Sequence, residues 1–109
     1  MLRTRKRKTT APGLKHDSNK PQWHLLPWEE LESVVKVLGF GAKKYGKNNW
    51  QRVQSGEQRY LDATLRHVKA ILTTESLDDQ TRLPHYAHAI ASLMFAYWHS
   101  NQKVRRIKK

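Results

Sequence analysis

Two histidines three residues apart are the best-placed residues of this sequence for chemistry. His85 and His88 stand in the segment PHYAHAIASLMF, which is otherwise apolar. Residues three apart on a helix face the same way, so both imidazoles can bind one metal ion or exchange protons near neutral pH. Asp78 and Asp79, just upstream, could orient an imidazole or add a ligand. Ordinary partly buried histidines are the alternative, which we favour only for a third histidine, His67.

A second pattern of this kind lies nearer the N-terminus. Glu29, Glu32 and Lys36 are spaced to share one helical face, with Lys43 further along it. Two carboxylates one turn apart can share Mg²⁺ or Mn²⁺ through oxygen, and lysines can meet phosphate oxygens. Taken alone, the pattern is more typical of an ordinary solvated helix face with ion pairs such as Glu32 to Lys36.

The first helix that must position these residues is predicted over 28–45. Pro27 suits a helix start, and Gly46 can take the left-handed conformation that ends a helix. Acidic residues in the first turn and lysines in the last favour the helix dipole. Its core stripe has helical spacing and consists of Leu31, Val34, Val35, Leu38, Ala42 and Tyr45.

Two further helices are predicted over 56–74 and 84–101. The second begins with a capping box, Ser55-x-x-Gln58, and the third begins at Pro84. A second apolar line on the middle helix (Tyr60, Thr64, His67 and Ile71) suggests burial on two sides. The expected core stripes are Leu61, Leu65, Val68 and Leu72 on the middle helix, and Tyr86, Ile90, Leu93 and Tyr97 on the last.

The last helix is apolar nearly all round, which is typical of a helix at the centre of a bundle. Three helices cannot enclose one of their own number. We therefore expect an all-α fold, a small bundle of three main helices whose core is completed by formation of a homo-oligomer, a dimer or tetramer. No segment predicts a strand.

The net charge of +12 is concentrated at the two ends of the chain. The stretches 1–20 and 103–109 hold most of the excess lysine and arginine, and the middle is close to neutral. Basic ends attract nucleic acid in a salt-dependent way, although solvated ends without a partner are an equal alternative. The expected organisation is a disordered basic arm over 1–14, a helical domain over 15–102 and a basic tail over 103–109.

Composition excludes several classes of protein. The 109 residues suffice for one domain, and the lack of cysteine excludes disulfides and cysteine zinc sites. No apolar run is long enough to cross a membrane, and no signal peptide is recognisable. Glycine-rich phosphate loops, HExxH and nucleophile elbows are also missing. We expect a cytoplasmic protein, in the host cytoplasm if a phage encodes it.

Three stretches together resemble a family of phage and prophage domains found at the N-terminus of dATP/dGTP diphosphohydrolases. That family is related to the all-helical, MazG-like nucleotide pyrophosphohydrolases. The GAKKYG…NW and LPHxAHA elements are specific as a pair, and Arg82 stands where related sequences usually have glycine. The matching stretches are KHDSNKPQWHLLPWEELESVVKVLGFGAKKYGKNNW (15–50), RYLDATLRH (59–67) and LDDQTRLPHYAHAIASLMF (77–95).

The resemblance implies a metal-dependent hydrolase that releases pyrophosphate from purine deoxynucleoside triphosphates. In MazG-like enzymes two acidic pairs bind magnesium and activate water. Here Glu29-x-x-Glu32 matches the first pair as catalytic and metal-binding acids, and His85-x-x-His88 replaces the second, with Asp79 added. Two imidazoles would suit Mn²⁺ better than Mg²⁺. The substrate- and phosphate-binding residues implied are Lys15, Asp17, Lys20, Lys43, Lys44, Tyr45, Asn49, Trp50, Arg66 and His67.

Two alternatives stay open at this point. The chain could bind and sequester a nucleotide without cleaving it, because the replacement of acids by His85 and His88 departs from the enzymes it resembles. It could instead be a phage nucleic-acid-binding protein that acts through its basic ends.

Overall fold

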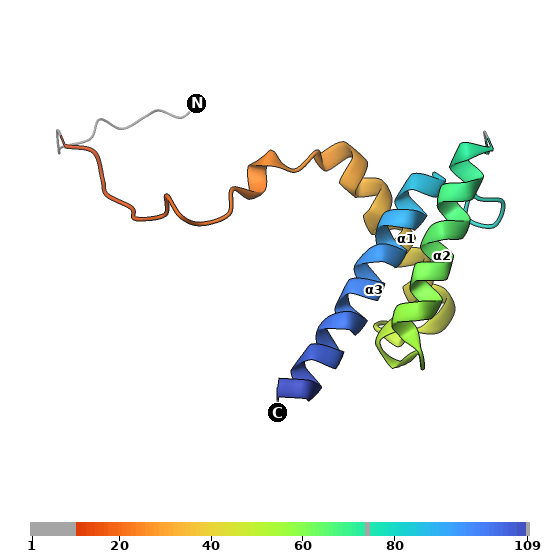
Figure 1. The fold of residues 1–109 in the computed structure, drawn as a ribbon. Helices are drawn as coiled ribbons and strands as arrows, with labels where there is room; N and C mark the ends of the chain where they lie inside the picture. Colours follow the sequence, from red (N-terminus) through yellow and green to blue (C-terminus); the bar gives the residue numbers. More distant parts are fainter. Residues whose placement is uncertain (1–10, 74, 109) are drawn as a thin grey trace.

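The computed structural model describes residues 11–73 and 75–108, and they form an all-helical fold as predicted (Figure 1). No strand occurs in these residues, and a single antiparallel bridge joins Leu77 to Pro84. None of the described helices combines the length and apolarity that crossing a membrane requires. The elements in chain order are the 3₁₀ helix η1 (Trp23–Leu25), α1 (Trp28–Tyr45), the 3₁₀ helix η2 (Asn49–Arg52), α2 (Gly56–Leu72) and α3 (His85–Lys108).

The bounds of α1 are those that the sequence predicts. Pro27 precedes the first residue, where a missing backbone N–H costs no hydrogen bond. Gly46 ends the helix with φ +97°, and its N–H donates to Ala42 O at 2.9 Å. Both ends depend on local backbone chemistry, and that is why the sequence alone suffices to place them.

The predicted capping box at the start of α2 is wrong. Ser55 has φ +54° and its side chain makes no capping hydrogen bond, and Gln58 Nε2 instead donates to Asp62 Oδ1. The reason is tertiary: Gly56 lies directly under the imidazole of His99 on α3, where a Cβ atom would overlap the ring. The close approach of α3 therefore determines the start of α2. This helix ends at Leu72, slightly before the predicted residue 74.

The third helix is longer than predicted, because α3 continues from residue 101 to Lys108. No proline or glycine follows Asn101, and the intervening Gln, Lys and Arg are good helix formers. Positive charge near a helix C-terminus also interacts favourably with the helix dipole. Of the stretch 103–109 assigned to a basic tail, residues 103–108 thus belong to this helix. Most of the predicted arm, residues 1–10, lies outside the described residues.

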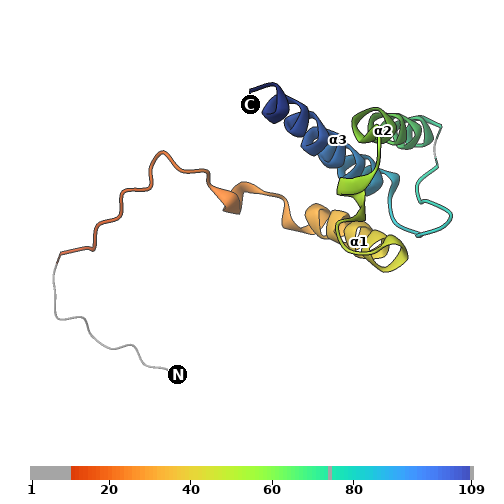
Figure 2. The same ribbon diagram turned by 90° about the horizontal axis from the view of Figure 1, so that it is seen from below.

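Helices α2 and α3 lie side by side and antiparallel, and α1 packs against one side of this pair (Figures 1 and 2). The small core lies between α1 and α3. Val34 is 2% exposed and contacts the buried alanines Ala87 and Ala91. The partly buried Leu31 and Leu38 pack around them.

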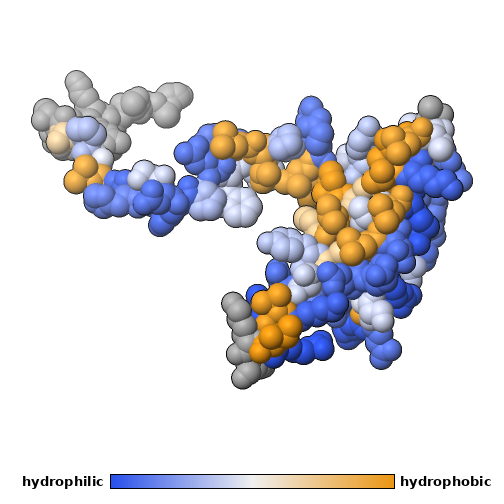
Figure 3. Space-filling view, in the orientation of Figure 1, coloured by the Kyte–Doolittle hydropathy of each residue, from blue (hydrophilic) through white to orange (hydrophobic). Residues whose placement is uncertain are grey.

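The core stripes predicted for α2 and α3 are not buried in the single chain, and that prediction is wrong. The second line of α2, which includes Tyr60 and His67, faces α3 instead, with rings of α3 stacked on or beside it. Figure 3 shows apolar side chains over α2 and α3 on the side away from α1. The exposed residues are Leu61, Leu65, Val68 and Leu72 of α2 and Tyr86, Ile90, Leu93 and Tyr97 of α3.

Candidate metal centre and adjoining cleft

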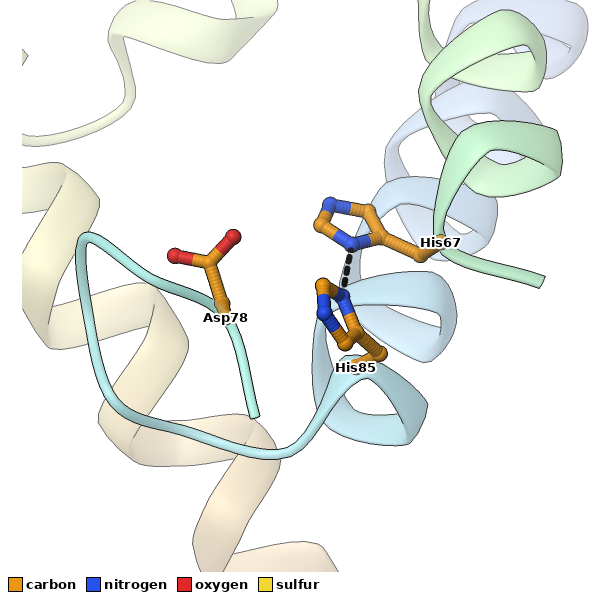
Figure 4. A group of neighbouring side chains, drawn as sticks. All are labelled: His67, Asp78 and His85. Atoms are coloured by element: carbon orange, nitrogen blue, oxygen red, sulfur yellow. Dashed lines mark hydrogen bonds between the residues drawn. The ribbon is translucent and has the colours of Figure 1, made fainter. Parts of the chain in front are cut away.

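Three side chains from separate elements converge where α2 ends and α3 begins. His67 lies near the end of α2, Asp78 lies in the connecting loop, and His85 is the first residue of α3. One potential ligand atom of each lies within 4.8 Å of the others (Figure 4). The two Nδ1 atoms are 2.9 Å apart, so one imidazole donates its N–H to the other. Two imidazoles and a carboxylate at this separation form a donor set that can bind a divalent metal ion.

His85 is the residue of this group that most needs a further partner. Its side chain is buried, and Nε2 makes no hydrogen bond. The carboxylate of Glu75 is 3.9 Å from Nε2, too far for a hydrogen bond. A buried nitrogen left unsatisfied costs about 1–3 kcal/mol. The donor set therefore fits a bound cation, because Nε2 of His85 has coordination capacity that the protein itself does not use.

The loop between α2 and α3 holds the Asp78 carboxylate in place. Its Oδ2 accepts hydrogen bonds from the backbone N–H of Gln80 at 3.0 Å and of Thr81 at 2.9 Å. The loop closes because the Arg82 N–H donates to Asp78 O at 2.8 Å, with Arg82 in the left-handed conformation at φ +60°. The Asp78 N–H donates in turn to Leu83 O. This compact turn fixes one carboxylate beside the imidazoles.

His88 completes the surroundings of the group. Its ring stacks on that of His67 with centroids 4.7 Å apart, and its Nε2 lies 2.7 Å from Thr81 Oγ1. The same nitrogen is 3.9 Å from Asp78 Oδ2. His88 therefore connects the α3 histidine pair to the loop and to α2, at the edge of the three-residue group.

The protonation states in this cluster favour metal binding at neutral pH. Burial lowers the pKa of His67, and the nearby imidazoles of His88 and His85 lower it further. Burial likewise lowers the pKa of His88. Burial alone would raise the pKa of Asp78. The hydrogen bonds from Thr81 and the electrostatic effect of the adjacent His88 outweigh burial, so the pKa of Asp78 is lowered. A neutral His67 imidazole beside an ionised Asp78 carboxylate is the combination of forms that binds a metal ion.

The acids predicted as metal ligands lie outside this group. Asp79 is fully exposed, with its carboxylate 4.0 Å from Arg82. Glu29 and Glu32 are exposed on the first turns of α1 and are not part of the group that the described residues form. Asp78 takes the place expected for Asp79, because Asp78 accepts the hydrogen bonds that shape the loop.

A polar cleft of about 680 Å³ lies between α2 and the segment that joins it to α1. Arg59 and Arg66, two turns apart on α2, contribute positive charge to its wall. Tyr45 and Asn49 line the opposite part. Three of the predicted substrate residues, Tyr45, Asn49 and Arg66, thus meet here. Arg59 is not among the residues predicted from the sequence, and the i, i+7 spacing of the two arginines in RYLDATLRH is the signal that points to it.

An apolar cavity of about 510 Å³ shares a wall with this cleft. Tyr45 and Asn49 line both spaces, and Trp50 lines the cavity. The Trp50 ring stacks on Phe95 at 4.3 Å, and its backbone oxygen accepts a hydrogen bond from His99. One face of Trp50 is therefore already used in packing. The shared wall joins an apolar space to a polar one lined by two arginines and one acid, Asp62, an arrangement suited to a ligand with a ring at one end and an anion at the other.

The remaining predicted ligand-binding residues are lysines and an acid that lie apart from the cleft. Lys43 and Lys44 are exposed on the last turn of α1, with Lys44 Nζ 5.1 Å from the centre of the Tyr45 ring. Residues 11–22, which carry the other three, extend away from the helices in Figures 1 and 2. The exposed residues Lys15, Asp17 and Lys20 line a shallow hollow formed only by that segment and η1.

Together these features describe an all-helical domain with a histidine and aspartate group that could hold a metal ion, and with a cleft lined by Arg59 and Arg66. The sequence matches the family described as dATP/dGTP diphosphohydrolase, N-terminal, over residues 10–107. The chain therefore belongs to this family. It is also 40% identical over 91 residues to a protein of Salmonella phage PMBT28 named dATP/dGTP diphosphohydrolase. That match covers 84% of this chain but only 31% of the relative. No solved structure matches the chain.

Acidification of the metal-free protein should lower its free energy of unfolding. His67 and His88 have pKa values below the ordinary 6.5 in the folded state. The unfolded chain therefore binds more protons between the folded and ordinary pKa values, and stability is lost as pH falls through that window. Urea denaturation with a chelator at about pH 7.5 and about pH 5.5 measures the change.

Two variants test whether His67 causes this loss of stability on acidification. His67→Gln should reduce the loss of stability on acidification, whereas His24→Gln, which changes an exposed histidine outside the cluster, should leave it as in the wild type. Stability that rises on acidification, or an equal loss in both variants, would contradict the assignment.

Proposed function

We propose that this domain binds a divalent metal ion and a purine deoxynucleoside triphosphate, as the substrate-binding part of a dATP/dGTP diphosphohydrolase. The observation that carries the proposal is the convergence of His67, Asp78 and His85 beside a cleft that contains two arginines. Family membership supports the substrate class, because the phage relative carries that name. The relative is about three times as long as the matched region, so cleavage by this domain alone is a separate part of the proposal.

The geometry of α2 connects the cleft to the metal-ligand group. Arg59 and Arg66 are seven residues apart, so their backbone positions differ by about 10 Å along the helix axis. Arg66 directly precedes His67, and a triphosphate that runs along α2 from Arg59 would thus bring its far end towards the histidines. Guanidinium groups bind phosphate oxygens with two parallel hydrogen bonds, which makes arginine well suited to this role.

The chemical roles of the residues follow from their positions. Arg59 and Arg66 neutralise phosphate charge, and Tyr45 and Asn49 contact the nucleoside at the wall shared with the apolar cavity. His67, Asp78 and His85 hold the divalent ion. When bound, that ion supplies positive charge that polarises phosphate oxygens and makes water a better nucleophile. With two nitrogen donors, the group favours Mn²⁺ or a similar transition ion over Mg²⁺.

Metal binding should depend on the partly buried Asp78 and not on its fully exposed neighbour Asp79. Asp78→Asn removes the charge next to the imidazoles while an amide oxygen still accepts the loop hydrogen bonds, so Mn²⁺ affinity should fall by at least about tenfold. Asp79→Asn is the matched control and should bind as the wild type does, because Asp79 is exposed. Isothermal titration calorimetry with Mn²⁺ measures both. Equal losses in the two variants would exclude Asp78 as the carboxylate ligand.

Nucleotide binding should depend on the cleft arginines. Arg66→Gln and Arg59→Gln each remove a charged donor, a loss of about 1.5–3 kcal/mol, or roughly 10- to 150-fold in dissociation constant for dATP or dGTP. Arg105→Gln is the control, because Arg105 is exposed on α3 and lies outside the cleft. Equilibrium dialysis with radiolabelled nucleotide and Mn²⁺ is a direct assay. Similar weakening in all three variants would reveal only general charge attraction.

Turnover is the third test. The proposal expects pyrophosphate release from dATP and dGTP in Mn²⁺, with a loss of at least about 100-fold when His85→Gln removes a metal ligand. Glu29→Gln should retain activity, because Glu29 lies outside the ligand group. If Glu29→Gln loses activity while it still folds and binds Mn²⁺, the result would contradict this assignment and indicate that the acids of α1 are needed for turnover.

A non-catalytic nucleotide binder is the second candidate. Two observations favour it: the ligand group holds a single carboxylate, and the matched region is under a third of the phage relative. It predicts tight dATP binding without pyrophosphate release in folded, metal-loaded protein. Binding and turnover assays on the same sample separate the two candidates.

A further inference from the structure

A polar hollow of about 840 Å³ lies at the opposite end of the α2–α3 pair from the metal-ligand group. Its walls come from η2, the first turn of α2 and the C-terminal half of α3. Gly56 lines this hollow and His67 lies near the other end of α2, so about 17 Å of helix axis separate them. A ligand in the hollow would therefore occupy a different place from the divalent ion.

Arginines are the main charged residues in the lining of this hollow. Arg105 and Arg106 reach it from α3 and Arg52 reaches it from η2, and none of the three forms an ion pair with another described residue. The acid in the lining, Glu57, is already paired, because its carboxylate accepts a hydrogen bond from Lys103 Nζ at 2.7 Å. Three arginines from two elements thus line one space, and no described carboxylate neutralises them.

A buried amide adds a further donor to this lining. Gln102 lies between Trp98 and Arg105 on the face of α3 that lines the hollow, at spacings of four and three residues. Its Nε2 is buried and donates no hydrogen bond to another described residue. Buried polar groups in folded proteins are nearly always hydrogen-bonded, so this amide is available to an oxygen acceptor. Phosphate oxygens are acceptors that suit both the amide and the arginines.

The shape of the hollow and the distribution of charge favour a small anion over a strand of nucleic acid. In the last turns of α3, Val104 and Ile107 are apolar and are 47% and 83% exposed, so the described positive charge does not continue around the helix. Proteins that bind a nucleic-acid strand use a positively charged groove that follows its backbone. The volume of the hollow instead lies within the range of roughly 300–1,000 Å³ that is typical of small-molecule sites.

We propose that this hollow binds a small anion that contains two or more linked phosphate groups. Each arginine can form two parallel hydrogen bonds to phosphate oxygens, and three arginines around one concave space can hold several linked phosphates. The metal-ligand group lies outside the hollow, so this binding needs no divalent ion. The inference is independent of the proposed function, because it uses arginines other than Arg59 and Arg66 of the cleft.

Metal-free calorimetry tests the proposal. Inorganic tripolyphosphate is titrated, with a chelator present, into a parent protein that carries Arg59→Gln and Arg66→Gln, so that the cleft contributes little. A salt concentration of about 0.15 M screens most general charge attraction. Addition of Arg52→Gln or Arg105→Gln to the parent should weaken binding at least about tenfold, because each removes a charged donor. Lys69→Gln is the matched control, because Lys69 is exposed on α2 outside the hollow.

The outcome for the parent protein is decisive even without the variants. A folded parent that does not bind tripolyphosphate overturns the proposal, as does equal weakening by Lys69→Gln and Arg105→Gln. A parent that ignores tripolyphosphate but binds a single-stranded oligonucleotide through the same arginines also overturns it and assigns the hollow to nucleic acid.

Two further titrations define the ligand and the location. ATP that binds the parent more tightly than tripolyphosphate supports a nucleotide as the ligand, and equal affinities support an inorganic polyphosphate. Arg105→Gln in the otherwise wild-type chain should leave the Mn²⁺-dependent binding of dATP unchanged. If that binding is lost as well, the hollow is part of the cleft, and the proposal of a separate site is overturned.

Discussion

The close pairing of α2 with α3 is the interaction on which the rest of the structure depends. At one end, Gly56 lies under the His99 ring with no room for a side chain. At the other end, His67 and His85 are joined by a hydrogen bond of 2.9 Å. The first contact fixes where α2 begins, and the second brings its last turns against the start of α3. The same pairing brings His67 and His85 of the candidate metal-ligand group together.

Small residues on α3 let α1 pack closely against it and also limit the size of the core between these two helices. Alanines such as Ala87 and Ala91 let α1 approach α3, but they bury little apolar area. The larger side chains lie on the opposite side of the helix pair. Among the described residues, few large apolar side chains therefore contribute to the core of the single chain.

Features determined by local chemistry could be predicted from the sequence, whereas features determined by tertiary contacts could not. Pro27 and Gly46 place α1 correctly, and the spacing of His85 and His88 identifies the histidine end of α3. His67 comes from another helix, and neither its direction nor the choice of Asp78 over Asp79 is encoded in spacing. Both require knowledge of how the loop folds back. The sequence also cannot tell which of the two apolar lines on α2 faces α3, because that depends on the same tertiary packing.

The conformation of Arg82 restricts how this sequence can change. A left-handed backbone costs an L-amino acid roughly 1–2 kcal/mol, and only glycine and, to a lesser extent, asparagine or aspartate escape most of that cost. Arg82 adopts it at φ +60° in the turn that holds Asp78. Valine, isoleucine or threonine would be poorly tolerated there, because branching at Cβ adds to the clash. The backbone conformation at this exposed position therefore restricts which amino acids can replace Arg82, even though its side chain lines neither the metal-ligand group nor the cleft.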